Sequence, residues 1–306
     1  MGRLVTRSDF DGLVCAMILK EMGEIDDIKF VHPKDVQDGK VDLNGNDITT
    51  NLPFDPRVKL AFDHHESETT RLEGTDSEGK LIIEPHAKSA ARVVYNYYGG
   101  KAKLPRITDE LMEAVDKGDS ADFTKEEILH PEGWVLMNFL MDARTGLGRF
   151  HNFRISNYDL MMTLIDHCLE HSVDEVLALP DVKERSDLYF AQQEQFREQL
   201  QRLVKIEGDV GVLDLRNEET IYAGNRFYIY AMFPEIKISV HVAWGFQKQN
   251  TAVMIGKSII NKTSPVNIGD ICLSYGGGGH ANAGTCQLAN DKADAELPGI
   301  IAKLQG

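Results

Sequence analysis

Short apolar runs alternate with helix-like segments through the first half of the chain, and this alternation restricts the folds that it can adopt. Strand-like apolar runs occur at residues 4–6, 28–31 and 58–62. Apolar side chains at helical spacing occur at residues 12–22, 87–98 and 107–115. Strands that alternate with helices form βαβ units, so the pattern predicts a mainly parallel sheet flanked by helices.

The last hundred residues have a different pattern, in which strands dominate. Residues 236–244 alternate apolar with polar side chains, which is typical of a half-buried strand. Further strands are predicted at residues 210–215, 227–231 and 251–255. The change of pattern predicts a second, smaller α+β domain that begins at about residue 208.

A long polar segment separates the two patterns. Residues 182–204 keep one apolar stripe at helical spacing, which suits a helix that bridges two domains or forms the surface of a homodimer. The length of 306 residues also favours two domains. The predicted organisation is a catalytic α/β domain at residues 1–175, a linker helix at 176–207 and the smaller domain at 208–306.

The composition limits the partners that the chain can bind. Its 48 acidic and 33 basic residues give a formal net charge of −15, which repels polyanions and disfavours duplex nucleic acid. A small phosphorylated substrate stays compatible with this charge where metal ions supply positive charge locally. The four cysteines show no CxxC spacing, no signal peptide is recognisable, and no apolar run reaches about 18 residues. These features predict a cytoplasmic protein without a membrane partner.

Two groups of metal-type side chains directly follow predicted strands. Asp9 and Asp11 come after the first strand, and Asp63-His64-His65 comes after the third. Because the carboxyl ends of parallel strands meet at one edge of a sheet, we expect these side chains to lie close together. An isolated aspartate before a helix would be interpreted as an N-cap, but the two groups together predict a binuclear metal centre. Oxygen and imidazole ligands without thiolates favour Mn²⁺ or Mg²⁺ over structural zinc.

The chain resembles the DHH phosphoesterase superfamily in two places. Asp63-His64-His65 and Thr-Arg-Ser-Asp-Phe-Asp-Gly at 6–12 resemble its first motifs. Gly-Gly-Gly-Gly-His-Ala-Asn-Ala-Gly at 276–284 resembles the glycine-rich signature of its C-terminal DHHA1 domain. The superfamily includes RecJ-like nucleases, nanoRNases, cyclic-dinucleotide phosphodiesterases and exopolyphosphatase-related proteins.

This resemblance implies a hydrolase that acts on a phosphodiester or phosphoanhydride bond with the help of one or two Mn²⁺ ions, or of Mg²⁺. The implied substrate is a short oligonucleotide, a dinucleotide or polyphosphate, held in a cleft between the two domains. The implied metal ligands are Asp9, Asp11, Asp47, His64 and Asp116. Asp47 is the best match for a ligand that bridges two ions, and Asp119 is the alternative to Asp116.

Arg7 departs from the family pattern, which has a metal-binding histidine at this position. A guanidinium has no free lone pair, so it cannot bind a metal ion. Four alternatives follow: a first metal with fewer protein ligands, an Arg7 that replaces the charge of that metal and holds a phosphate, a site that binds without catalysis, or an Arg7 turned outward into a salt bridge. We expect a retained but altered site with a weakened first metal, in which Arg7, Asp63 and His65 act in catalysis. The alternative function is a catalytically impaired nucleotide-binding or phosphate-binding protein of the same fold.

The glycine-rich segment is expected to bind the substrate. Four consecutive glycines open their backbone N–H groups to a ligand, and the small residues that follow favour a packed loop–helix junction. By the resemblance, Gly278, Gly279 and His280 would grip the terminal phosphate or end nucleotide of the substrate. Arg226 and Ser258 lie near predicted strand ends and are expected to add phosphate contacts, with a solvated surface position as the alternative.

Overall fold

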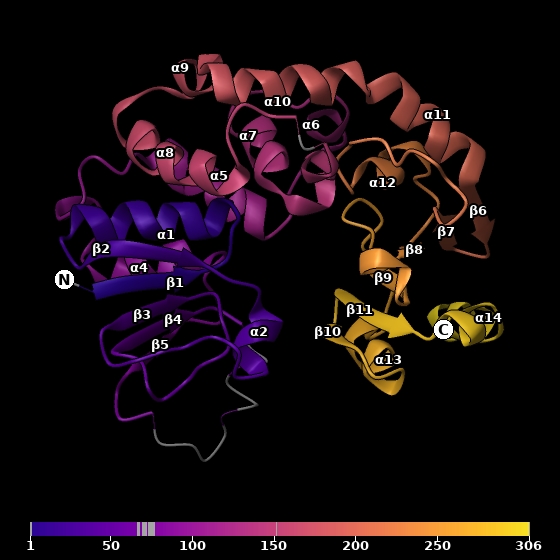
Figure 1. The fold of residues 1–306 in the computed structure, drawn as a ribbon, viewed down its shortest axis with the longest axis horizontal. Coiled ribbons are helices and arrows are strands. Elements are labelled where there is room, and N and C mark those ends of the chain that lie inside the picture. The colour runs from indigo at the N-terminus through magenta and orange to yellow at the C-terminus, as the bar shows by residue number, and fades with distance from the viewer. Residues whose placement is uncertain (1, 66–67, 69–71, 73–76, 151, 306) are drawn as a thin grey trace. The chain divides into compact units, whose positions relative to one another are not determined.

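The computed structural model describes residues 2–65, 68, 72, 77–150 and 152–305 of the chain (Figure 1). The chain divides into an N-terminal unit, residues 1–123 and 131–187, and a C-terminal unit, residues 124–130 and 188–306. Each unit has its own sheet and its own hydrophobic core. The mixed α/β fold predicted from the sequence, with a second and smaller sheet domain, is confirmed.

The N-terminal unit is built on a five-stranded sheet in the order β2-β1-β3-β4-β5. Its strands are β1 (Gly2–Thr6), β2 (Ile25–Phe30), β3 (Asp47–Thr50), β4 (Leu60–Asp63) and β5 (Leu81–Ile83). Every strand pairing described in this sheet is parallel, so the five strands end at the same edge. We call this edge the carboxyl edge and the opposite one the amino edge.

Helices cover one face of this sheet (Figure 1). Helix α1 (Phe10–Glu21) lies within that layer, and all its residues from Phe10 to Leu19 are buried, because it packs between the sheet and further helices. The other helices of the unit are α2 (Pro33–Gln37), α4 (Ala90–Tyr97), α5 (Asp109–Asp119), α7 (Gly133–Met141), α8 (Asn157–Glu170) and α9 (Val173–Ala178). Three short 3₁₀ turns complete the unit: η1 (Gly100–Ala102), η2 (Ala143–Thr145) and η3 (Leu147–Arg149).

The two faces of the sheet are both buried. Successive residues of a strand point to opposite faces, so Leu4 joins the core beneath the helices, whereas Val5 joins a smaller core with Val36 and Phe54. A parallel sheet covered on both faces is the usual setting for a site at the strand ends, because only the carboxyl edge is left open for ligands.

The C-terminal unit contains a six-stranded sheet in the order β10-β11-β9-β8-β7-β6. Its strands are β6 (Val204–Glu207), β7 (Val210–Asp214), β8 (Ile238–Trp244), β9 (Thr251–Lys257), β10 (Gly278–His280) and β11 (Ala283–Leu288). Only the β7–β8 pairing of this sheet is parallel among the described residues. Its helices are α6 (Lys125–Leu129), α12 (Tyr228–Met232), α13 (Ile268–Ser274) and α14 (Asn290–Leu304), with a 3₁₀ turn η4 (Phe246–Lys248). Helices α13 and α14 contribute Cys272 and Ile300 to the core over this sheet.

Two predictions for this unit are corrected. Residues 227–231 are not a strand but contain most of α12, because a short continuous apolar run has no periodicity that separates a buried strand from a buried helix. The glycine-rich segment does not lead into a helix. It follows α13 and enters the hairpin of β10 and β11, where a Cβ on Gly277 would lie 2.2 Å from the carbonyl oxygen of Thr285.

The expected linker is two helices rather than one. Helix α10 (Pro180–Ala191) ends before Gln192, and α11 (Gln193–Leu203) continues from it. Helix α11 is fastened to the C-terminal unit, since Gln199 donates to Glu218 and to the carbonyl of Thr220, and Arg202 pairs with Glu218. The second segment of the C-terminal unit therefore includes α11 and begins at Leu188. None of the helices in the described parts of the chain combines the length and the apolar character that crossing a membrane requires.

Candidate metal centre

The chain turns from β1 into α1 at the carboxyl edge, and this turn positions the first two aspartates. Asp9 caps α1, because its Oδ1 atom accepts a hydrogen bond of 3.0 Å from the backbone N–H of Gly12. Gly12 permits the turn, since a Cβ there would lie 2.0 Å from the carbonyl oxygen of Arg7. Asp11 then follows in the first helical turn and faces the interior, with only 2% of its surface exposed.

Asp11 is held entirely by neutral N–H donors. Its carboxylate accepts hydrogen bonds from the backbone of Ala90 at 3.3 Å and of Ala91 at 2.8 Å, and from Nδ2 of Asn51 at 2.8 Å. The two alanines begin α4, so the carboxylate lies at the positive end of that helix. Burial, together with the negative charges of Asp119 and Asp9, nevertheless raises the pKa of Asp11 to about 8. This carboxylate therefore lies in a place that favours a nearby cation.

His64 brings an imidazole to the same place. Its Nδ1 atom lies 3.1 Å from the carbonyl oxygen of Ala87, which fixes the ring and directs Nε2 toward Asp119. The Nε2 atom is 3.0 Å from Oδ2 of Asp119, but the ring is not aligned with that oxygen for a hydrogen bond, and no other described group supplies one. Burial disfavours a charged ring, yet Asp119 and Asp11 outweigh it and raise the pKa of His64 to about 9.

Asp11, His64 and Asp119 together fit a divalent ion. One ligand atom from each lies within 4.8 Å of the other two. Two carboxylate oxygens and one imidazole nitrogen form a donor set that suits Mn²⁺ or Mg²⁺, and no thiolate is present in it. The buried Nε2 atom without a hydrogen bond would gain a partner from such an ion. We call this group the metal triad.

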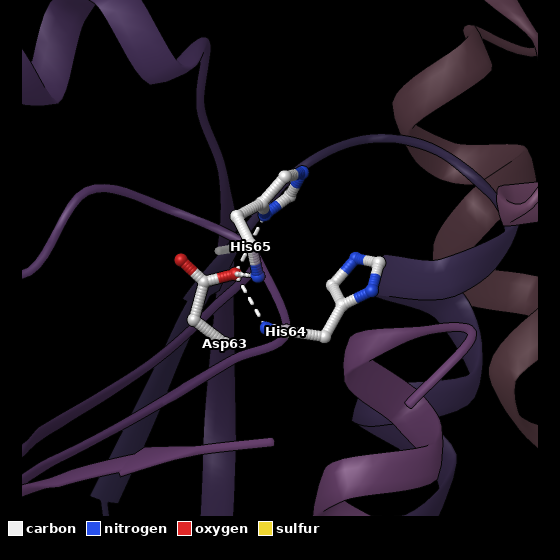
Figure 2. A group of neighbouring side chains, drawn as sticks. All are labelled: Asp63, His64 and His65. Carbon is white, nitrogen blue, oxygen red and sulfur yellow. Dashed lines mark hydrogen bonds and ion pairs between the residues drawn. The ribbon is translucent and has the colours of Figure 1, made fainter. Parts of the chain in front are cut away.

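Asp63 and His65 form a second arrangement beside the metal triad (Figure 2). The Oδ1 atom of Asp63 lies 2.7 Å from Nδ1 of His65 and also accepts the backbone N–H groups of His64 and His65 at 2.7 and 3.2 Å. In Figure 2 the His64 ring points away from this carboxylate. Asp63 is buried, so it fixes the loop after β4 and orients the His65 ring, whose side chain is 25% exposed.

Arg7 points into the acidic centre. Its Nε atom lies 3.0 Å from Oδ2 of Asp9. Burial opposes the charged guanidinium, but Asp9, Asp119 and Asp11 more than compensate and raise its pKa further. Arg7 therefore makes the salt bridge that one alternative expected, but with a carboxylate of the centre.

Asp47 does not lie with the other predicted ligands, and its assignment as a bridging ligand is corrected. It begins β3 at the amino edge, about 13 Å of strand away from the carboxyl edge. Arg3 donates from Nε and Nη2 to its two oxygens, at 2.9 Å each, and the backbone of Asn44 donates to it at 2.8 Å. The residue of β3 that reaches the centre is Asn51, just past the end of the strand. Sequence reasoning missed Asn51, because the residues of β3, Asp-Ile-Thr-Thr, contain no apolar run that would mark a strand end.

The two candidate aspartates of α5 have different contacts. Asp116 accepts a hydrogen bond of 2.7 Å from Ser89 and two from Arg92, at 2.9 and 2.7 Å. Asp119, about one helical turn further on, belongs to the metal triad instead. Asp116 therefore anchors the start of α4, which in turn supplies the N–H donors to Asp11.

The predicted substrate residues lie in the C-terminal unit. Gly278, Gly279 and His280 form β10, and the turn after it adjoins the end of β9, where the N–H of Lys257 donates to Asn282. Ser258 follows β9, is buried, and uses its hydroxyl to accept two backbone N–H groups of the next turn, so its visible role is structural.

Arg226 lies in the same unit, and its guanidinium carbon is 4.0 Å from the centre of the Phe227 ring. It is close enough to His241 in β8 to act on it electrostatically. Burial, reinforced by the charge of Arg226, lowers the pKa of His241 to about 4.

Carboxylates and an imidazole gathered at the carboxyl edge of a parallel α/β sheet define the class of metal-dependent hydrolases. Comparison with solved structures shows which family of metal-dependent hydrolases the chain belongs to. The chain is 56% identical to the pGpG-specific phosphodiesterase PggH from Vibrio cholerae, with 99% of each chain covered and a TM-score of 0.83. The chain therefore belongs to the DHH phosphoesterase superfamily.

A more distant comparison supports the fold alone. RecJ from Thermus thermophilus, solved in complex with Mn²⁺, is 16% identical with a TM-score of 0.54, and the match covers 99% of this chain and 51% of the RecJ chain. No protein-family model and no curated protein sequence matches the chain.

Proposed function

We propose that this chain hydrolyses the phosphodiester bond of the linear dinucleotide pGpG and releases two molecules of GMP, with Mn²⁺ as the preferred ion and Mg²⁺ as the alternative. One observation carries the proposal. The chain is 56% identical over almost its whole length to a phosphodiesterase described as specific for pGpG. The metal triad of this chain supplies the chemistry that such a reaction needs.

The metal triad would hold the ion. Asp11, His64 and Asp119 are its ligands, and Asn51 and the start of α4 keep Asp11 in place. When bound, a divalent ion lowers the pKa of a coordinated water and stabilises negative charge on a phosphoryl group.

The remaining residues of the centre act on the substrate directly. The guanidinium of Arg7 has a planar set of N–H donors that fits the oxygens of a phosphate. Asp63 orients the His65 ring through the 2.7 Å contact with Nδ1, so His65 is placed to donate a proton to the 3′ oxygen that leaves when the P–O bond breaks. Both assignments follow from the position of these side chains beside the metal triad.

The C-terminal unit is proposed to recognise the dinucleotide. Gly278 and Gly279 lie in the exposed edge strand β10, where the side of the backbone that faces away from β11 can reach a ligand. His280 and Arg226 are suitable partners for a terminal phosphate. Ser258 supports the turn next to this hairpin.

Hydrolysis of defined substrates tests the proposal. With Mn²⁺, the wild-type chain is expected to convert pGpG to GMP and to leave cyclic di-GMP, polyphosphate and a longer oligoribonucleotide much less affected. D11N is expected to lower kcat by about 1,000-fold or more, because it removes a charged ligand from the ion. D166N is the matched control: Asp166 is exposed and pairs with Lys20 away from the centre, so its activity should equal that of the wild type. If neither the wild type nor D11N hydrolyses pGpG but both still bind it, the result would support the alternative function, a nucleotide-binding protein without catalysis.

A further inference from the structure

We infer that the acidic centre holds a single divalent ion at the metal triad, and that the guanidinium of Arg7 replaces a second cation beside Asp9. The inference rests on the proposed function only for the presence of a divalent ion. The guanidinium of Arg7 would supply the positive charge beside Asp9 that a second metal ion would otherwise supply.

Both oxygens of Asp9 already have partners. Oδ1 accepts the N–H of Gly12 that caps α1, and Oδ2 lies 3.0 Å from Nε of Arg7. A second guanidinium, that of Arg144, is close enough to act on Asp9 electrostatically. Burial and the charge of Asp119 still raise the pKa of Asp9, but its two oxygens are already engaged by a backbone N–H and by a guanidinium of the chain itself.

Asp11 is only two residues away but has the opposite environment. Its three hydrogen-bond donors, from Asn51, Ala90 and Ala91, are all neutral. Asp119 adds a second negative charge at this place, and His64 offers it a nitrogen ligand. Among the described residues, the ion pairs therefore place a guanidinium on Asp9 but an imidazole on Asp119, and the hydrogen bonds of Asp11 come from neutral donors.

The geometry of the ligand atoms also points to one ion. Among the residues that the structure describes, the groups whose ligand atoms lie within 4.8 Å of one another are the metal triad and Asp63-His64-His65, and Asp9 belongs to neither. These two groups share His64, whose Nδ1 atom is held by the carbonyl of Ala87, so only Nε2 is available to an ion. In the second group, Oδ1 of Asp63 is already bonded to His65 and to two backbone N–H groups.

Arg7 is well suited to this role. A guanidinium stays protonated at every accessible pH, so its charge does not depend on the supply of metal. Its backbone is fixed by the close approach of Gly12, and its side chain faces the carboxylates of Asp9, Asp11, Asp119 and Asp142. Its planar N–H donors can also bind a phosphate oxygen in the way that a metal ion would, but with hydrogen bonds.

Counting Mn²⁺ ions tests the inference independently of activity. The chain is equilibrated with Mn²⁺, and its bound metal is measured by calorimetry, elemental analysis and electron paramagnetic resonance. We expect one tightly bound ion per chain, with the spectrum of an isolated Mn²⁺. D9N should keep this single ion, whereas D11N, the same change two residues away, should lose it. Two tightly bound ions with an exchange-coupled spectrum, or loss of one of two ions in D9N, would overturn the inference.

The role of Arg7 as a cation is tested by R7Q and R7K. R7Q should keep one Mn²⁺ per chain but lower kcat for pGpG by about 100-fold, and R7K should recover part of that loss because it restores the charge without the planar donors. Wild-type kinetics in R7Q would overturn the role. One bound ion without pGpG hydrolysis would refute the proposed substrate alone, and two ions with hydrolysis would refute this inference alone.

Discussion

Each of the two edges of the parallel sheet contains a buried aspartate, but the hydrogen-bond partners of the two aspartates differ in charge. At the amino edge, Asp47 is completely buried and receives two hydrogen bonds from the guanidinium of Arg3. At the carboxyl edge, Asp11 is almost as buried, but its partners are neutral and its nearest charged neighbours include two further carboxylates. Burial alone therefore does not distinguish the two residues. The difference lies in whether the chain provides its own counter-charge.

The same difference recurs within helix α5. Asp116 is paired with the guanidinium of Arg92, whereas Asp119 faces His64 and the carboxylate of Asp11. Asp9 completes the series, because it lies at the carboxyl edge but is paired with Arg7. Under the proposed function, the carboxylates paired with arginine act in structure, and the carboxylates next to His64 are the metal ligands.

The largest expected effect comes from breaking the metal triad within α5. D119N should lower kcat for pGpG by about 1,000-fold and abolish tight Mn²⁺ binding, because it removes a charged ligand. D116N, the matched change one turn earlier, should lower kcat by about tenfold or less, since Asp116 only anchors Ser89 and Arg92. Steady-state kinetics and calorimetry measure both effects. Equal losses of kcat and of Mn²⁺ affinity in D119N and D116N would contradict the assignment of metal binding to Asp119 and of a structural role to Asp116.

The next largest effect is on stability, and it comes from a substitution at the amino edge. D47N leaves the Arg3 charge without its partner and should lower the free energy of unfolding by about 2–3 kcal/mol, a value reduced because Arg3 is partly exposed. The activity of the folded D47N protein and its affinity for Mn²⁺ should equal those of the wild type. Denaturant unfolding and Mn²⁺ titration test this pair of expectations, and a loss of Mn²⁺ affinity in D47N would contradict them.

Mn²⁺ should stabilise the chain through the carboxyl edge alone. An ion that binds only the folded state adds about 2.7 kcal/mol at a concentration of 100 times its Kd. Thermal unfolding with and without Mn²⁺ should show this gain in the wild type and in D47N, and should not show it in D119N. A similar gain in D119N would place the ion elsewhere.

The smallest expected effect concerns Asn51. N51A removes one hydrogen bond from Asp11 and also places alanine at a φ of 55°, in the left-handed region, so we expect a loss of about 1–2 kcal/mol in stability and a several-fold decrease in kcat. N51G keeps the backbone conformation and separates the two causes, because only the lost hydrogen bond remains. If N51G behaves like the wild type in kcat, the bond to Asp11 has no part in the centre.

The sequence predicted the parallel sheet, and it predicted which residues follow its strands, because apolar runs mark the strand ends. Asp9, Asp11 and His64 follow apolar runs, and the parallel topology then brings them to one edge. The resemblance selected Asp47 by its approximate position alone, and Asp47 begins β3, where the direction of the strand places it at the opposite edge. Asn51 lies at the carboxyl end of that strand and was missed because the sequence Asp-Ile-Thr-Thr of β3 contains no apolar run.

Other features depend on contacts that periodicity does not contain. Asp116 and Asp119 lie about one turn apart on α5, and only the positions of Arg92 and His64 separate their roles. The apolar run of α12 fits a strand or a helix equally well in the sequence. The glycines of β10 predict a loop before a helix, whereas their lack of side chains allows the hairpin with β11 to pack closely.

Anomalous scattering from a crystal soaked in Mn²⁺ and measured at the manganese edge tests the central claim most directly. The account predicts one strong peak within ligand distance of Asp11, His64 and Asp119, with Arg7 still paired to Asp9 and no peak beside Asp47. A peak at Asp9, a second peak of equal height in the centre, or a peak at the amino edge would contradict it.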